Sequence, residues 1–159
     1  MLLRIVFSLP LARRTLLFVA EHSCLPASIP GCKEEWRGFK WQSVFSPLDP
    51  ELSHTGGVGG MARDPFRIFT IPPMSPILRK VIHNGRVGII GCDIGGPQHA
   101  IFYVVYGWTG GHQSNYAATR TDGLIAAIAD DVKLRESNIP IGMAGDLNCT
   151  PERLPHLLE

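Results

Sequence analysis

The sequence predicts an α/β fold in one domain, and three observations support this prediction. Several short apolar segments rich in β-branched and aromatic residues are typical of strands. One segment in the last third of the chain has the apolar spacing of a helix, and a strand is predicted on either side of it. The chain has 159 residues, 45% of them hydrophobic and 18% charged, which is typical of a globular domain with one core. The formal net charge is +1, so bulk charge argues neither for nor against a nucleic-acid partner.

The first predicted strand covers residues 15–20, which are mostly apolar and are followed by Glu21. Prolines and a glycine between residues 21 and 38 favour a loop or a short helix there. Three more short strands are predicted before the proline-rich stretch that begins at residue 72, at 39–45, 58–63 and 66–71.

A β-hairpin is predicted in the middle of the chain. Residues 78–83 are followed by Asn84 and Gly85 and then by the apolar run 86–94. Asn-Gly supplies the two positive-φ residues that a type I′ turn requires, so we expect two strands joined at this dipeptide.

The C-terminal part contains the strongest predicted strand, residues 99–108, and a helix over residues 119–134. Thr119 and Asp122 form a weak capping pattern at the start of that helix. A strand is then predicted at 139–144, with a turn at 145–148 and a new helix beginning at 150–152.

Asp146 and Asn148 follow that last strand directly. Side chains two residues apart on an extended backbone point the same way, so we expect both to face one small group. An aspartate can accept a proton from water, while an amide can hold the water or a phosphate oxygen. Both residue types are also common in turns for structural reasons alone.

The N-terminal residues 1–14 allow two interpretations: a targeting segment, or a displaced part of the domain. No segment approaches the ~18 apolar residues of a membrane span, so we expect no stable membrane insertion. The four cysteines lack metal-site spacing and favour free, buried thiols in a reducing, intracellular compartment.

Three segments resemble motifs of the endonuclease/exonuclease/phosphatase superfamily. The segment A-G-D-L-N-C-T-P at 144–151 resembles its G-D-x-N signature, and V-V-Y-G-W at 104–108 resembles the strand that ends in its catalytic-site tyrosine. The segment L-L-F-V-A-E-H at 16–22 resembles the strand that ends in its metal-binding glutamate. The order and rough spacing of these segments match the family from about residue 15 onward.

The resemblance implies a two-sheet β-sandwich flanked by helices, in four layers (α/β/β/α), and hydrolysis of a phosphate ester that depends on Mg²⁺ or Mn²⁺. Glu21 would bind the metal ion, and Tyr106 would place its hydroxyl near the scissile phosphate. Asp146 would orient or deprotonate the attacking water, and Asn148 would help to hold it. Arg120, near the start of the predicted helix, would contact phosphate, although a solvated helix end is the simpler interpretation.

For the substrate we favour a nucleic acid, as for the apurinic-endonuclease-like and retroelement-endonuclease-like members of the superfamily. A phosphatase acting on a small-molecule or lipid phosphate ester is the alternative within the family.

Departures from the family pattern keep a second alternative open. Residues 1–14 lack the family's asparagine, and the later S-D-H-like motif is absent, so we expect a partial domain, truncated at both ends. Neither His112 nor His156 is expected to replace that motif, and His22 and His54 are more simply structural. The chain would then be a catalytically inactive remnant.

Overall fold

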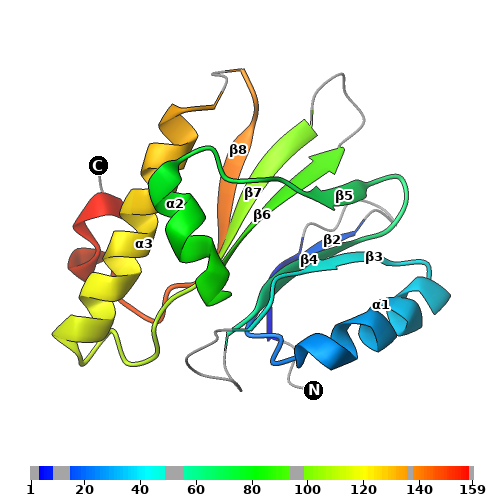
Figure 1. Cartoon of the computed structure of the whole chain (residues 1–159), viewed down its shortest axis with the longest axis horizontal. Helices are drawn as coiled ribbons and strands as arrows, with labels where there is room; N and C mark the ends of the chain where they lie inside the picture. Colours follow the sequence, from blue (N-terminus) through cyan, green and yellow to red (C-terminus); the bar gives the residue numbers. More distant parts are fainter. Residues whose placement is uncertain (1–3, 9–14, 49–55, 94–98, 136–137, 158–159) are drawn as a thin grey trace.

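The structure is a computed structural model that describes residues 4–8, 15–48, 56–93, 99–135 and 138–157. Two β-sheets pack face to face and helices lie outside them (Figure 1), which confirms the predicted α/β two-sheet sandwich. Among the described residues, no helix has the length and apolarity that crossing a membrane requires.

The first sheet has the strand order β1-β2-β4-β3, and every neighbouring pair is antiparallel. Its strands are β1 (Arg4–Ser8), β2 (Leu16–Ala20), β3 (Gln42–Phe45) and β4 (Val58–Ala62). A short 3₁₀ helix η1 (Pro26–Ser28) and the helix α1 (Ile29–Gly38) connect β2 to β3, and α1 lies beside β3 (Figure 1).

The second sheet has the order β5-β6-β7-β8. Its strands are β5 (Arg67–Thr70), β6 (Val87–Asp93), β7 (His99–Tyr106) and β8 (Ile141–Asp146). The first three are antiparallel, whereas β8 is parallel to β7. The helix α3 (Asn115–Lys133) forms the crossover that a parallel pair requires.

Two hydrophobic clusters hold these layers together. One lies between the sheets and includes Phe18, Val58, Ile90 and Tyr106. The other lies between the second sheet and the helices α2 (Pro76–Val81) and α3, which cover its outer face (Figure 1). The strands β6 and β7 contribute side chains to both clusters, because successive residues point to opposite faces of a sheet.

The predicted hairpin at Asn84-Gly85 is wrong. Its first strand is instead the helix α2 (Pro76–Val81), followed by a 3₁₀ turn η2 (Ile82–Asn84). Ser75 caps this helix, with its hydroxyl accepting hydrogen bonds from the backbone N–H groups of residues 77 and 78. Gly85, with φ 64°, ends the turn in the left-handed region. The Asn-Gly pair therefore terminates a helix, a role that also favours glycine.

Two other segments differ from the prediction. The helix α3 begins four residues before Thr119, and its N-cap is Ser114, whose hydroxyl accepts a hydrogen bond from Ala117 N–H. The segment after β2 contains the helix α1, in line with the short helix allowed there. The helix predicted from residue 150 consists of two 3₁₀ turns, η3 (Pro151–Arg153) and η4 (Pro155–Leu157).

Candidate functional site

Tyr106 and Asp146 end neighbouring strands and lie opposite each other in the register of β7 and β8. The next residue, Gly107, connects the two strand ends by a hydrogen bond: its N–H donates to the carbonyl of Asp146 at 2.7 Å. Its carbonyl accepts from the side-chain amide of Asn148 at 3.0 Å. Three residues predicted for the site are therefore brought together around one glycine.

The prediction that Asp146 and Asn148 project together from an extended backbone is wrong in its geometry. Asn148 has a φ of 51°, in the left-handed region, and its backbone N–H donates to the Asp146 carboxylate at 3.0 Å. The chain thus turns around the carboxylate, a turn that aspartate and asparagine both favour. One oxygen of Asp146 is oriented by this turn, and both side chains are partly exposed.

Gly107 tolerates no side chain. A Cβ atom there would lie 2.0 Å from the carbonyl oxygen of Leu147, which is far below any real contact. The close approach lets the turn at residues 147–148 pack over the end of β7. Gly107 belongs to the segment V-V-Y-G-W, but a single sequence does not reveal which part of the backbone will approach a glycine.

Glu21 follows β2 in the opposite sheet and is partly exposed, with a φ of 59°. Burial raises the pKa of the Tyr106 hydroxyl, and the neighbouring Glu21 carboxylate raises it further, as both acceptor and negative charge. Tyr106 itself is 3% exposed and also lies 3.3 Å from the Thr109 hydroxyl. Glu21, on the first sheet, therefore lies near enough to Tyr106, on the second, for its charge to affect the tyrosine hydroxyl.

Left-handed backbone at a residue other than glycine, asparagine or aspartate is strained. Glu21 has this strained conformation. Asn148 has it too, but asparagine tolerates left-handed backbone. Both follow a strand at the same end of the sandwich, because Glu21 affects Tyr106, which is the register partner of Asp146. Ser23 and Lys40 have positive φ as well, so this backbone conformation is not confined to the candidate site.

His22 is fully buried behind Glu21. Its Nδ1 accepts a hydrogen bond from Cys24 N–H at 3.0 Å, so the ring is neutral and its Nε2 donates to the carbonyl of Ser46, also at 3.0 Å. Burial lowers the pKa of His22, although the bond to Ser46 opposes that effect. The ring packs directly against Gly57, where a Cβ would lie 2.4 Å from it. His22 is thus a structural residue that fixes the turn carrying Glu21.

A row of arginine and aromatic side chains leads away from Tyr106. The guanidinium of buried Arg86 lies 5.2 Å from the Tyr106 ring centroid and 4.7 Å from that of Trp108, and it donates to the carbonyl of Gly107 at 3.1 Å. Arg120 lies 4.3 Å from the same Trp108 ring. The sequence suggested Arg120 but missed Arg86 and Trp108, because the latter lie on separate segments that only the fold brings together.

The oxygen ligands that Glu21, Asp146 and Asn148 offer suit a hard cation such as Mg²⁺, which usually keeps several waters. Asn148 uses its amide N–H on Gly107, so its amide oxygen is the atom that would face a ligand. Within the described ranges, no three His, Cys, Asp or Glu side chains are grouped closely enough to hold a metal ion. The donor chemistry fits, and an ion here would depend on water and substrate oxygens for the rest of its coordination.

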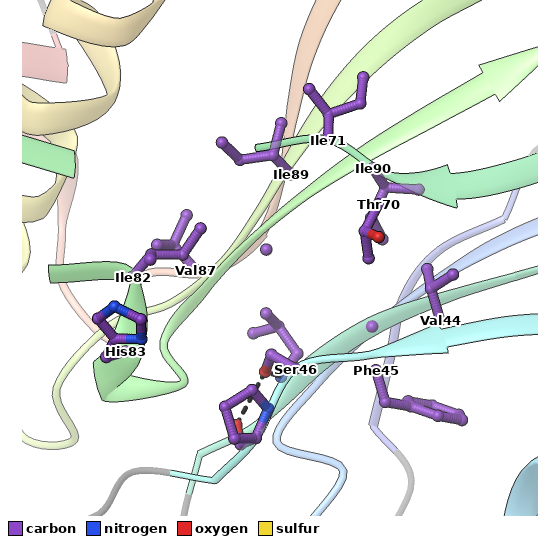
Figure 2. A pocket seen from close by; sticks show the side chains of 14 residues that line it. Val44, Phe45, Ser46, Thr70, Ile71, Ile82, His83, Val87, Ile89 and Ile90 are labelled. Carbon is purple, nitrogen blue, oxygen red and sulfur yellow. Dashed lines mark hydrogen bonds between the residues drawn. The ribbon is translucent and has the colours of Figure 1, made fainter. Parts of the chain in front are cut away.

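A pocket of about 220 Å³ opens between the sheets, where β3 and β4 face the start of β6. Figure 2 shows that aliphatic side chains such as Val44, Ile71 and Ile90 line most of it. The lining contains no carboxylate, lysine or arginine. His83, Ser46 and Thr70 are its polar side chains, and none of the candidate-site residues lines it, so this pocket is separate from the candidate site.

The remaining histidines lie away from the site or outside the described residues. His112 is exposed, and His54 lies outside the described part of the chain. His156 pairs with Asp122, with Nδ1 2.6 Å from a carboxylate oxygen, and lines a hollow with residues of α3. This aspartate–histidine pair was missed, because its members are 34 positions apart and carry no local signal.

No family model, no curated protein and no solved structure matches this chain. We therefore base its function on the geometry and chemistry of the residues above.

Proposed function

We propose that this chain is a metal-dependent phosphoesterase whose site consists of Glu21, Tyr106, Asp146 and Asn148. The observation that carries the proposal is the convergence of these residues at one end of the sandwich. Glu21 from the first sheet interacts with Tyr106 from the second, and Tyr106 is the register partner of Asp146. Glu21 is therefore near residues of the second sheet that are 85 or more positions away in the chain.

Asp146 is the group that would receive a proton from the attacking water. Its carboxylate is held by the N–H of Asn148, and an ionised carboxylate can accept a proton from water. Asn148 is itself anchored on Gly107, so its amide oxygen has a fixed direction. Rigid placement of both groups lowers the cost of aligning a water with a phosphorus atom.

Glu21 is the residue that would hold a divalent cation. The buried Tyr106 hydroxyl would orient the Glu21 carboxylate. When bound, Mg²⁺ or Mn²⁺ would stabilise negative charge on the phosphate oxygens and on the leaving oxygen. The resemblance of the three sequence segments to the endonuclease/exonuclease/phosphatase superfamily supports the same roles.

A nucleic-acid phosphodiester is the substrate we favour. Arg120 supports this, because its guanidinium lies on the aromatic row that leads from Tyr106 towards the surface. Arginine on such a surface can contact a phosphate beyond the scissile one. A phosphomonoester or a lipid phosphate ester has no neighbouring backbone phosphate that Arg120 could contact.

Cleavage of supercoiled and abasic-site DNA in the presence of Mg²⁺ tests the proposal. We expect cleavage by the full chain and its loss in Asp146→Ala, with the exposed-helix variant Asp130→Ala as matched control. Activity on p-nitrophenyl phosphate without activity on DNA would instead favour a phosphatase. Absence of turnover on all three substrates, by protein that circular dichroism shows to be folded, would favour the inactive remnant.

A further inference from the structure

We propose that Tyr116 is a stacking platform for a base of the nucleic-acid strand, placed beyond the phosphate-cleaving groups. This inference rests on the proposed function, because it assigns a subsite to the same substrate. Tyr116 lies in the first turn of α3 and is 72% exposed, the highest value among the large hydrophobic side chains of the described residues. An aromatic ring left this open to water contributes little to the core, so the face opposite Arg120 is available to a ligand.

Tyr116 is connected to the candidate site by alternating rings and cations. Arg86 lies against the rings of Tyr106 and Trp108, and Arg120 lies against the rings of Trp108 and Tyr116, at 4.3 and 5.6 Å from the ring centroids. The row runs from a buried tyrosine beside Glu21 to an exposed tyrosine on the surface. Arg86 and Tyr106 are buried, so a strand whose scissile phosphate lay at Asp146 would contact the row only at its exposed end, Tyr116.

The charges around Tyr116 suit a polyanion. Arg120 approaches the ring from within α3. Arg153 is held nearby, since its guanidinium donates to the side chain of Asn115 at 2.9 Å and to the carbonyl of Gly111 at 2.6 Å. Aromatic rings interleaved with arginines bind single-stranded nucleic acid by stacking bases on the rings and pairing phosphates with the cations. A protein partner would be the other occupant of an exposed tyrosine, but it would not require two flanking cations.

Binding measurements on the full chain separate base stacking from charge attraction. Asp146→Asn would be used as the background, so that cleavage does not interfere. The probes are a fluorescein-labelled single-stranded oligonucleotide and an oligonucleotide of equal length in which every base is replaced by an abasic analogue, followed by fluorescence anisotropy. The second probe keeps the phosphates and lacks the bases.

We expect Tyr116→Ala to weaken binding of the base-bearing strand about 5- to 150-fold, the effect of losing one stacked base. Tyr116→Phe keeps the ring and should bind like the parent, and the abasic strand should bind both variants equally. Phe39→Ala is the matched control, because Phe39 is a second exposed aromatic (62%) and follows α1, which lies beside the other sheet (Figure 1).

Unchanged affinity of Tyr116→Ala for the base-bearing strand would overturn the platform, and so would an equal loss on both probes. These outcomes are distinct from failure of the proposed hydrolysis. Base-selective binding through Tyr116 without any DNA cleavage would leave the platform in place and remove the catalytic proposal. Cleavage with no effect of Tyr116→Ala on binding would do the reverse.

Discussion

The carboxylate of Glu21 lies near enough to Tyr106 to affect its hydroxyl, although the two residues belong to different sheets. Burial and this carboxylate both raise the pKa of the tyrosine. Glu21 is held in left-handed backbone at the end of β2, so the contact reflects a fixed backbone as well as a flexible side chain.

We therefore expect Glu21→Gln to lower the pKa of Tyr106, because a neutral amide no longer opposes the negative phenolate. The pKa can be followed by NMR titration of ¹³Cζ-labelled tyrosine, with Tyr106→Phe assigning the signal. Glu34→Gln, on the exposed surface of α1, is the control and should leave the titration unchanged. An unaltered Tyr106 titration in Glu21→Gln would show that the two groups do not interact in solution.

Gly107→Ala should destabilise the fold and abolish activity, because its Cβ would overlap the carbonyl of Leu147 and push the Asp146–Asn148 turn away. Overpacking of this kind costs about 1–3 kcal/mol. Gly123→Ala, at an open position of α3 with nothing within 4 Å, should instead stabilise the protein by about 0.5–1 kcal/mol. Urea denaturation of both variants measures the contrast, and equal effects would refute the close contact.

Acidification should weaken the protein through His22. Its folded-state pKa is lowered below the unfolded value of about 6.5, so the unfolded state binds the proton more readily. The contribution of the neutral ring is thus complete above about pH 6.5 and is lost as the pH falls towards the folded-state pKa.

The measurement is the urea midpoint at a series of pH values for the parent, His22→Asn and His112→Gln. We expect the decline below about pH 6.5 to become shallower in His22→Asn and to remain in His112→Gln, whose histidine is exposed. If the urea midpoint of His22→Asn falls below about pH 6.5 as steeply as that of the parent, another group causes the loss of stability.

Asp131 should be the most sensitive aspartate of α3. Its carboxylate accepts hydrogen bonds from the N–H groups of residues 74 and 75, from the Tyr103 hydroxyl and from Arg135, whose side chain is 5% exposed. Burial alone would raise the pKa of Asp131, but these donors outweigh it and the pKa is lowered.

We expect Asp131→Ala to cost about 3–5 kcal/mol, because it leaves a buried arginine and several donors without their acceptor. Asp130→Ala removes an exposed pair with Lys133, 3.7 Å away, and should cost less than about 1 kcal/mol. Denaturant unfolding of the two neighbours gives a direct comparison. Similar losses would show that the buried network contributes little.

Much of the fold could be predicted because its strands have strong local signals. The β-branched and aromatic run of β7 and the apolar run of β2 each form the strand expected of them. The hairpin prediction before Gly85 was wrong for a local reason as well. Ser75-Pro76 is a helix start signal, and Asn84-Gly85 suits both a helix end and a hairpin, so the local sequence allows either structure.

The candidate site was predictable only in part. Asp146 and Asn148 were predicted from their place after a strand, and Tyr106 from the family resemblance. The register of β7 and β8 pairs Tyr106 with Asp146, and Asn148 binds the neighbouring Gly107. The packing of Leu147 over Gly107 and the burial of Arg86 between two rings depend on contacts between distant segments. Such contacts leave no periodic or spacing signal in a single sequence.

The central claim is that Glu21 and Asp146 act in one hydrolytic site. The most direct test is the rate of Mg²⁺-dependent DNA nicking by Glu21→Gln, by Asp146→Ala and by the double variant. Groups that act as a unit give non-additive losses, so we predict that the double variant is no slower than the slower single variant. Losses that multiply, or full activity in either single variant, would contradict the account.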